Sequence, residues 1–317
     1  MSGDRTGEGR FLTKVGKTLR HYGARVLWAG RDVWCRVAGI SSGRPVFVMG
    51  CSRAGTTLVY KTLSEAAELG SLQAETHDFW DGLHPLAARG WSSHVLGAAD
   101  AGRSEAAEVF RHFYRRTGKQ RFVDKNNQNG LCVEYLRALF PDAIFVYVKR
   151  SPGDNINSLM EGWRRPDQFA TWSADLPAQV AVDGGQYQRW CFFLPPGWRD
   201  YLEAPLEEVC AYQYRSMNEA ILNAQDLSHE DTWVDVHYED LVYDPVAGFR
   251  QVFNHCGLGF PERIRSHCES VLRRPYNAFS EIRVEKWRTA ADSQRIARVL
   301  PTVRGVAARM GYREAGG

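Results

Sequence analysis

The sequence GCSRAGTT (residues 50–57) has the glycine spacing of a phosphate-binding loop. The Walker motif of nucleotide triphosphatases places lysine after the second glycine, where it contacts the β- and γ-phosphates. Thr56 stands at that position here. The stretch therefore indicates a loop that binds phosphate but is poorly suited to a magnesium-bound triphosphate.

The residues around this loop predict a strand, a turn and a helix in that order. Residues 45–49 are a short apolar run, typical of a strand buried on both faces of a parallel sheet. Residues 56–69 place apolar side chains at helical spacing. In such a unit the glycines let backbone amides approach an anion, and the helix N-terminus attracts it. A strand-to-helix turn without any ligand is the alternative interpretation.

The composition predicts one globular domain and argues against several classes of protein. The 317 residues are 44% hydrophobic and 24% charged, and the net charge of +3 is too small to indicate nucleic-acid binding. The seven cysteines are scattered without a Cys-x-x-Cys pair, which favours reduced thiols in the cytoplasm over a zinc site. No apolar run approaches the roughly 18 residues that span a bilayer. We therefore expect a cytoplasmic protein.

Residues 1–43 are expected to form a basic extension before the main domain, which we place at residues 44–317. Basic residues recur between Arg5 and Arg36 among apolar ones, in an amphipathic helical pattern. Such a segment either rests on an anionic membrane surface or packs as a surface helix on the domain itself. The extension therefore allows a cytoplasmic protein that is also membrane-associated.

The rest of the chain alternates predicted strands and helices. Strands are predicted at residues 70–73, 121–125, 144–148 and 233–237, and helices at 104–116, 131–140, 152–164 and 205–222. This alternation is typical of an α/β fold with a central parallel sheet and helices on both faces. Residues 163–204 form an irregular, aromatic-rich insertion, which either covers the substrate or packs into the core.

Charged residues follow three of these predicted strands. Glu75 to Trp80 come after the short strand, Lys125 ends the next, and Lys149 and Arg150 end the apolar strand 144–148. Ligands of open α/β sheets bind beyond the carboxyl ends of the strands. We therefore expect these residues near the phosphate loop, with the two basic residues forming a second phosphate site.

In this order the motifs resemble those of the sulfotransferases that use 3′-phosphoadenosine 5′-phosphosulfate (PAPS), in particular the bacterial branch. Residues 52–58 resemble the 5′-phosphosulfate loop of that family, and Arg150-Ser151-Pro152 with Ser158 resembles its 3′-phosphate motif. Residues 237–242 resemble a further signature, and residues 286–288 resemble the late basic motif that closes over the cosubstrate. The match extends over about residues 45–288. It also accounts for Thr56, because PAPS offers two separated anionic groups and no γ-phosphate.

The resemblance implies a P-loop-like fold and transfer of the sulfuryl group of PAPS to a hydroxyl or amine, with release of adenosine 3′,5′-bisphosphate. The implied acceptor is a small molecule, a lipid or a glycolipid, and no metal is implied. The implied cosubstrate-binding residues are Ser52, Arg53, Ala54, Gly55, Thr56, Thr57, Arg150, Ser158, Tyr238, Lys286, Trp287 and Arg288.

Arg53 and Lys125 are the cations that the resemblance places at the transferring group. The base that accepts the acceptor proton is expected to be Glu75, which matches a family glutamate, or His77 two residues later. Residues 126–129, where some relatives carry histidine, contain only asparagine and glutamine. Two alternatives remain: a P-loop nucleotide kinase-like enzyme, and a non-catalytic nucleotide-binding protein on the same fold.

Overall fold

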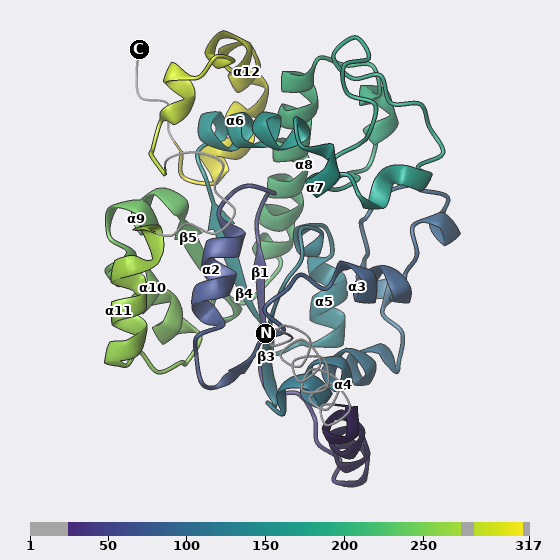
Figure 1. Ribbon diagram of the computed structural model, residues 1–317, viewed down its shortest axis with the longest axis vertical. Coiled ribbons are helices and arrows are strands. Elements are labelled where there is room, and N and C mark those ends of the chain that lie inside the picture. The colour runs from purple at the N-terminus through teal and green to yellow at the C-terminus, as the bar shows by residue number, and fades with distance from the viewer. Residues whose placement is uncertain (1–24, 274–281, 313–317) are drawn as a thin grey trace, which may run out of the picture.

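A five-stranded parallel sheet forms the centre of the protein in the computed structural model, which describes residues 25–273 and 282–312 (Figure 1). The strand order is β2-β3-β1-β4-β5, and every neighbouring pair is parallel. The α/β class predicted from the sequence is confirmed. The strands are β1 (Val46–Met49), β2 (Leu69–Gly70), β3 (Arg121–Lys125), β4 (Ile144–Lys149) and β5 (Trp233–His237).

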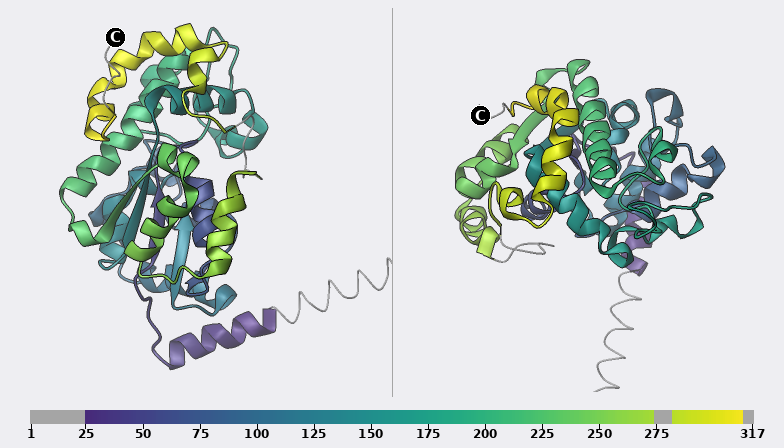
Figure 2. Two further views of the ribbon diagram at one scale, coloured as in Figure 1. Left: turned by 90° about the vertical axis from the view of Figure 1, so that its left-hand side faces the viewer. Right: turned by 90° about the horizontal axis from the view of Figure 1, so that it is seen from above.

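Helices cover both faces of this sheet, as Figures 1 and 2 show. Side chains alternate along β1, so that Phe47 and Met49 pack in one hydrophobic cluster and Val46 and Val48 in another. The first cluster includes residues of α4 (Glu105–Thr117), α5 (Val133–Leu139), α6 (Pro152–Trp163), α8 (Leu206–Asp226) and α12 (Ser293–Arg309). The second includes residues of α2 (Thr56–Leu63), α9 (Tyr238–Tyr243), α10 (Pro245–His255) and α11 (Glu262–Ser270).

The position of β1 determines what surrounds the phosphate loop. β1 lies between β3 and β4, and Val48 is in register with Lys125 and with Val146. The carboxyl ends of the three strands therefore meet at one edge of the sheet. The loop that follows β1 has the end of β3 on one side and the end of β4 on the other.

The helix predicted over residues 56–69 is wrong beyond Leu63. Ser64 Oγ donates to the carbonyl of Tyr60 and lies 2.7 Å from Ser71 Oγ, so the chain turns there. Leu69 and Gly70 then pair with β3, which leaves a shorter strand than the predicted one. His77 begins a further helix, α3 (His77–Leu83).

The aromatic side chains of the insertion at 163–204 lie largely in the core. Trp163, Trp190 and Trp198 are fully buried, with their rings in edge contact along the series. Apart from the short helix α7 (Pro166–Phe169), the segment is built mainly of turns and short 3-10 pieces. Packing into the core accounts for these three tryptophans.

Residues 25–37 form a helical segment at the base of the molecule, drawn in purple in Figure 2. The predicted amphipathic pattern before residue 25 lies outside the described residues. In the described ranges, no helix is both long and apolar enough to cross a membrane. All seven cysteines are buried free thiols.

Candidate active site

The loop between β1 and α2 is held in shape by contacts from β4 and α6. Arg150 Nη1 donates to the carbonyl of Arg53 at 2.7 Å, and Asn155 Nδ2 donates to the carbonyl of Ser52 at 2.9 Å. Arg53 has φ 70°, in the left-handed region that costs non-glycine residues backbone energy. These two carbonyl contacts stabilise the strained turn, and Asn155 is a positioning residue that the sequence motifs did not reveal.

Gly55 lets the loop approach Tyr238, the first residue of α9. Its φ is 104°, and a Cβ atom there would lie 2.4 Å from Tyr238 Cδ2. Thr56, buried, and Thr57, half-buried, open α2, where first-turn amides have no acceptor within the helix. Cys51 and Ala54 are buried in the loop. Burial raises the pKa of the Cys51 thiol, which suits a small packing residue rather than a nucleophile.

Arg150 and Lys149 point to opposite sides of the sheet. The Arg150 guanidinium lies 4.5 Å from the centroid of the Tyr238 ring, beside the loop. Lys149 Nζ instead bonds Asp235 Oδ2 of β5 at 2.6 Å. The expectation that both basic residues form the second phosphate site is therefore wrong for Lys149, because successive side chains of a strand alternate between its faces.

Of the fourteen buried side-chain polar atoms without a hydrogen-bond partner in the described parts of the chain, three that can donate lie where the loop meets β4 and α6. Ser52 Oγ, Arg150 Nε and Ser151 Oγ have no hydrogen-bond partner within the described parts of the chain. Buried donors in native proteins are almost always paired. Hydrogen-bond donors without a partner, next to the N-terminus of α2 and to Arg53 and Arg150, suit an anionic ligand.

Arg53 reaches from the loop toward α6. Its Nε donates to Ser158 Oγ at 3.4 Å, and its guanidinium lies 5.4 Å from the centroid of the Phe169 ring. Burial, and then the neighbouring charge of Arg150, lower the pKa of Arg53 to about 10, so it remains a cation at neutral pH. The structure thus brings Arg53, Arg150 and Ser158 together.

The late basic motif lies against the start of α6. Asp154 accepts hydrogen bonds from the backbone amides of Glu285 and Trp287, at 2.6 and 3.1 Å. A Cβ atom on Gly153 would lie 2.4 Å from Trp287 Nε1, so glycine is what lets the indole approach. Asp154 was not among the predicted site residues, although an acidic residue in a first helical turn is a signal that could have found it.

The two basic residues of that motif, Lys286 and Arg288, differ in burial and in the carboxylate that each pairs with. Lys286 Nζ is 3.5 Å from Glu161 Oε2, and burial lowers its pKa, with the charge of Arg150 acting in the same direction. Arg288 is largely exposed, pairs with Glu285 and lies 5.0 Å from the centroid of the Trp287 ring. Of the two, Lys286 is the one that lies within electrostatic range of Arg150.

Lys125, Glu75 and His77 form one cluster at the end of β3. Lys125 Nζ donates to Glu75 Oε1, and His77 Nε2 bonds Glu75 Oε2. Burial opposes ionisation of Glu75, but the charge of Lys125 and the contacts of His77 hold its pKa well below the usual range. Glu75 is therefore an ionised carboxylate that links the other two side chains.

Asp124, which the sequence analysis did not select, fixes this cluster to the sheet. It accepts hydrogen bonds from Thr76 Oγ1 at 2.7 Å, Trp80 Nε1 at 3.0 Å and Asn129 Nδ2 at 3.4 Å. Burial raises the pKa of its carboxyl group. Because Asp124 precedes Lys125 in β3, these bonds hold the segment that carries Glu75 against Lys125.

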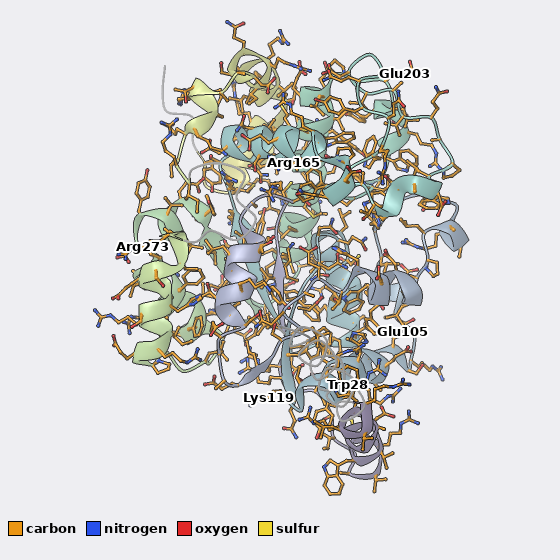
Figure 3. All side chains as sticks on the ribbon, in the orientation of Figure 1. Trp28, Glu105, Lys119, Arg165, Glu203 and Arg273 are labelled. Carbon is orange, nitrogen blue, oxygen red and sulfur yellow. The ribbon has the colours of Figure 1, made fainter. Side chains whose placement is uncertain are left out.

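A cavity of 610 Å³ opens beside Glu75 and His77. Its walls include Phe79 of α3, His112 and Arg116 of α4, and Trp28 of the helical segment 25–37. These wall residues could not be predicted from the sequence, because they belong to no recognisable motif. Figure 3 labels Trp28 at the lower end of the molecule, next to α4. The volume of the cavity suits a small molecule or part of a larger one.

Comparison with known proteins places these features in a family. The model of the group described as "Sulfotransferase family" matches residues 45–262. Similar solved structures include the sulfotransferase domain of the Synechococcus PCC 7002 olefin synthase, with 18% identity, TM-score 0.47 and coverage of 83% of this chain and 94% of that one. A sulfotransferase from Mycobacterium avium has 14% identity, TM-score 0.49 and coverage of 86% and 81%. No curated protein matches the sequence.

Proposed function

The chain belongs to the sulfotransferase family, and we propose that it transfers the sulfuryl group of PAPS to a hydroxyl or amine of a small-molecule or lipid acceptor. Adenosine 3′,5′-bisphosphate is the second product. The observation that carries the proposal is the set of open buried polar atoms at Ser52, Arg150 and Ser151. These donors lie between the two motifs that resemble phosphate-binding motifs.

The residues present fit a ligand with two separated anionic groups. The loop, with Thr56, Thr57 and the first-turn amides of α2, would hold the 5′-phosphate. Arg150 and Ser158 would hold the 3′-phosphate, with Lys286 and Trp287 closing over it from the late motif. Arg53 and Lys286 both lie within electrostatic range of Arg150, and Glu161 beside Lys286 offsets only part of their charge, so the cluster favours an anionic ligand.

The cosubstrate supplies a sulfuryl group carried on a phosphate leaving group. The acceptor oxygen forms a new bond to sulfur while the bond between sulfur and the phosphate oxygen breaks, and the electron pair departs with the phosphate. Arg53 and Lys125 stabilise the negative charge that develops on these oxygens. Positioning and charge stabilisation carry most of the catalysis in such an in-line transfer.

The acceptor proton goes to the Glu75 and His77 pair. Both side chains line the cavity, so an acceptor bound there would meet one of them. Glu75 is the proposed base; His77 is the alternative, in which case Glu75 orients the imidazole and balances its charge. The ion pair with Lys125 keeps Glu75 deprotonated, and because the same contact lowers its pKa, Glu75 is a weaker base than an ordinary glutamate while that pair is intact.

Labelled PAPS incubated with the purified protein and a panel of hydroxylated and amino acceptors tests this function. We expect a sulfated product, together with adenosine 3′,5′-bisphosphate. A protein that binds magnesium-ATP but not adenosine 3′,5′-bisphosphate would instead be a kinase-like enzyme. A protein that binds the bisphosphate without hydrolysing PAPS or transferring from it would be a non-catalytic nucleotide-binding protein.

A further inference from the structure

The helical segment 25–37 carries a continuous apolar stripe on its exposed side. Val26, Val33 and Val37 recur at helical spacing, and Leu27 and Trp34 lie next to them on the same side. Their exposed fractions range from 52% to 78%. Scattered exposed apolar residues are ordinary, but five on one side of one short helix form a patch that suits a binding surface.

The opposite side of this segment is firmly attached to the domain. Arg31 Nη1 donates to the carbonyl of Arg116 at 3.2 Å, near the C-terminal end of α4, and Cys35 is buried. The guanidinium of Arg116 lies 5.5 Å from the centroid of the Trp28 ring. Trp28, Arg31 and Cys35 share one side of the helix, so the stripe is exposed because the other face is already packed.

Positive charge accompanies the stripe. Arg25 and Arg36 are exposed on the same segment, and Arg36 pairs with Asp32 at 2.8 Å. Asp32 is the only acidic residue among residues 25–37, so the three arginines leave the segment with a net positive charge. The sequence of residues 1–24 contains five basic residues and two acidic ones. In that stretch of sequence the apolar residues Leu12, Val15, Leu19 and Tyr22 follow one another at intervals of three or four. An apolar stripe bordered by arginine and lysine is typical of helices that lie in the surface of anionic membranes.

The same segment forms part of the acceptor cavity. Trp28 lines the 610 Å³ cavity together with Glu75 and His77. Because the stripe lies on the opposite side of the helix from Trp28, a surface that holds the stripe would lie about one helix diameter from the cavity wall that Trp28 forms. An acceptor that resides in that surface would have a short path to the proposed base.

We propose that the helical segment 25–37 docks the enzyme on an anionic lipid bilayer, and that the acceptor is a membrane-resident lipid alcohol that enters the cavity beside Trp28. The docking is independent of the chemistry, whereas the choice of acceptor rests on the proposed function. A bilayer fits better than a second copy of the chain, because each copy of this segment has a net positive charge and two copies would repel each other. Anionic headgroups attract these arginines instead.

Vesicle binding tests the docking. The full-length protein is sedimented with vesicles of phosphatidylcholine alone and with vesicles of equal parts phosphatidylcholine and phosphatidylglycerol. We expect binding to the anionic vesicles and a loss of at least about tenfold in the double variant Val33→Asp/Val37→Asp. Leu227→Asp is the matched control, since Leu227 is also exposed, at 69%, on another part of the surface. It should bind as the wild type does.

Equal vesicle binding by the wild type and the double variant would overturn the docking, as would no binding by the wild type. A dimer that becomes a monomer in the double variant by light scattering would also overturn it, because the stripe would then be an interface between copies. Melting temperatures of the three proteins should agree, since all three positions are exposed.

Transfer to two alcohols tests the acceptor. With labelled PAPS, the wild type should sulfate hexadecanol held in anionic vesicles at least about tenfold faster than the double variant, while both act equally on a water-soluble short alcohol. Equal rates on vesicle-held hexadecanol would overturn the acceptor assignment. Vesicle binding without transfer to any alcohol would leave the docking supported and the proposed function contradicted, so the two failures are distinct.

Discussion

The two sides of the candidate active site are built in different ways. On the proposed cosubstrate side, Ser52, Arg150 and Ser158 are buried, and each belongs to a segment that directly follows β1 or β4. On the acceptor side, Glu75 and His77 are about a third exposed, at 32% and 33%. The cavity beside them takes walls from α3, α4 and the helical segment 25–37.

The strand order constrains the two sides of the site to different degrees. The cosubstrate side follows from the strand order, because any chain with β1 between β3 and β4 brings those loop and strand ends together. The acceptor side depends on how α3, α4 and the helical segment 25–37 pack against one another, and this packing can differ between sequences that share the strand order. Substitutions on the cosubstrate side should therefore lower the rate of transfer to every acceptor by a similar factor. Substitutions near the cavity should lower it by factors that differ from one acceptor to another.

Arg53→Ala is expected to have the largest effect. Removing one preorganised donor at the reacting group typically lowers kcat by about 10²–10³-fold. Arg53→Lys is the control that keeps a cation, and it should retain more activity than alanine. Steady-state kinetics with several acceptors measures the change. A decrease in kcat with one acceptor only would contradict the proposed difference between the two sides.

Glu75→Gln is expected to lower kcat by about 10²-fold, with little change in affinity for adenosine 3′,5′-bisphosphate. His77→Gln is the comparison that separates the two candidate bases. Full activity in the Glu75 variant would show that another residue accepts the acceptor proton.

The pH dependence should follow the lowered pKa of Glu75. A base must be deprotonated, so a lowered pKa preserves activity as pH falls toward about 4.3, where an ordinary glutamate titrates. The contribution of the Glu75 ion pair to stability is present above that pH. It is lost as pH falls through the lower pKa of the folded state. An acid limb of kcat assigned to Glu75 at or above pH 5 would contradict the ion pair with Lys125.

Gly55→Ala is expected to weaken cosubstrate binding by about 1–3 kcal/mol, the usual cost of backbone strain at such a position. The new Cβ would also press on the Tyr238 ring. Gly257→Ala is the matched control, because Gly257 has φ 62° and no atom within 4 Å of its added Cβ. Calorimetric affinities should fall in the first variant alone, and equal affinities would show that the loop tolerates a side chain.

Gly153→Ala is expected to have the smallest effect. The added Cβ must displace the indole of Trp287, which belongs to the late motif. Affinity for adenosine 3′,5′-bisphosphate should fall by about threefold to tenfold, because one contact shifts while the loop stays intact. If the affinity is unchanged, Trp287 does not close over the cosubstrate.

The cosubstrate side was largely predictable from the sequence. Strands at 121–125 and 233–237 have the predicted bounds, and the loop, Lys125 and Arg150 each come at the end of a strand. Apolar runs and glycine spacing are local signals, so a single sequence suffices to find them. Lys149 is the exception: strand alternation turns it away from Arg150, and its partner Asp235 lies 86 residues away in β5.

The acceptor side was not predictable to the same degree. Asp124 is separated by 48 residues from Thr76, its bonding partner, and Trp28 reaches the cavity only because Arg31 attaches its helix to α4. Such contacts follow from tertiary packing, which no motif records. The helix end at Leu63 was missed for a similar reason, because Leu69 pairs with β3 instead of continuing the helix.

Calorimetric titration with adenosine 3′,5′-bisphosphate, in the absence of metal, tests the divided phosphate site. We expect one site per chain in the wild type and a loss of about 1.5–3 kcal/mol of binding free energy in Arg150→Ala, the usual worth of a charge-assisted hydrogen bond. Lys149→Ala, one residue away, should bind as the wild type does. No binding by the wild type, or equal binding by all three proteins, would contradict the divided phosphate site.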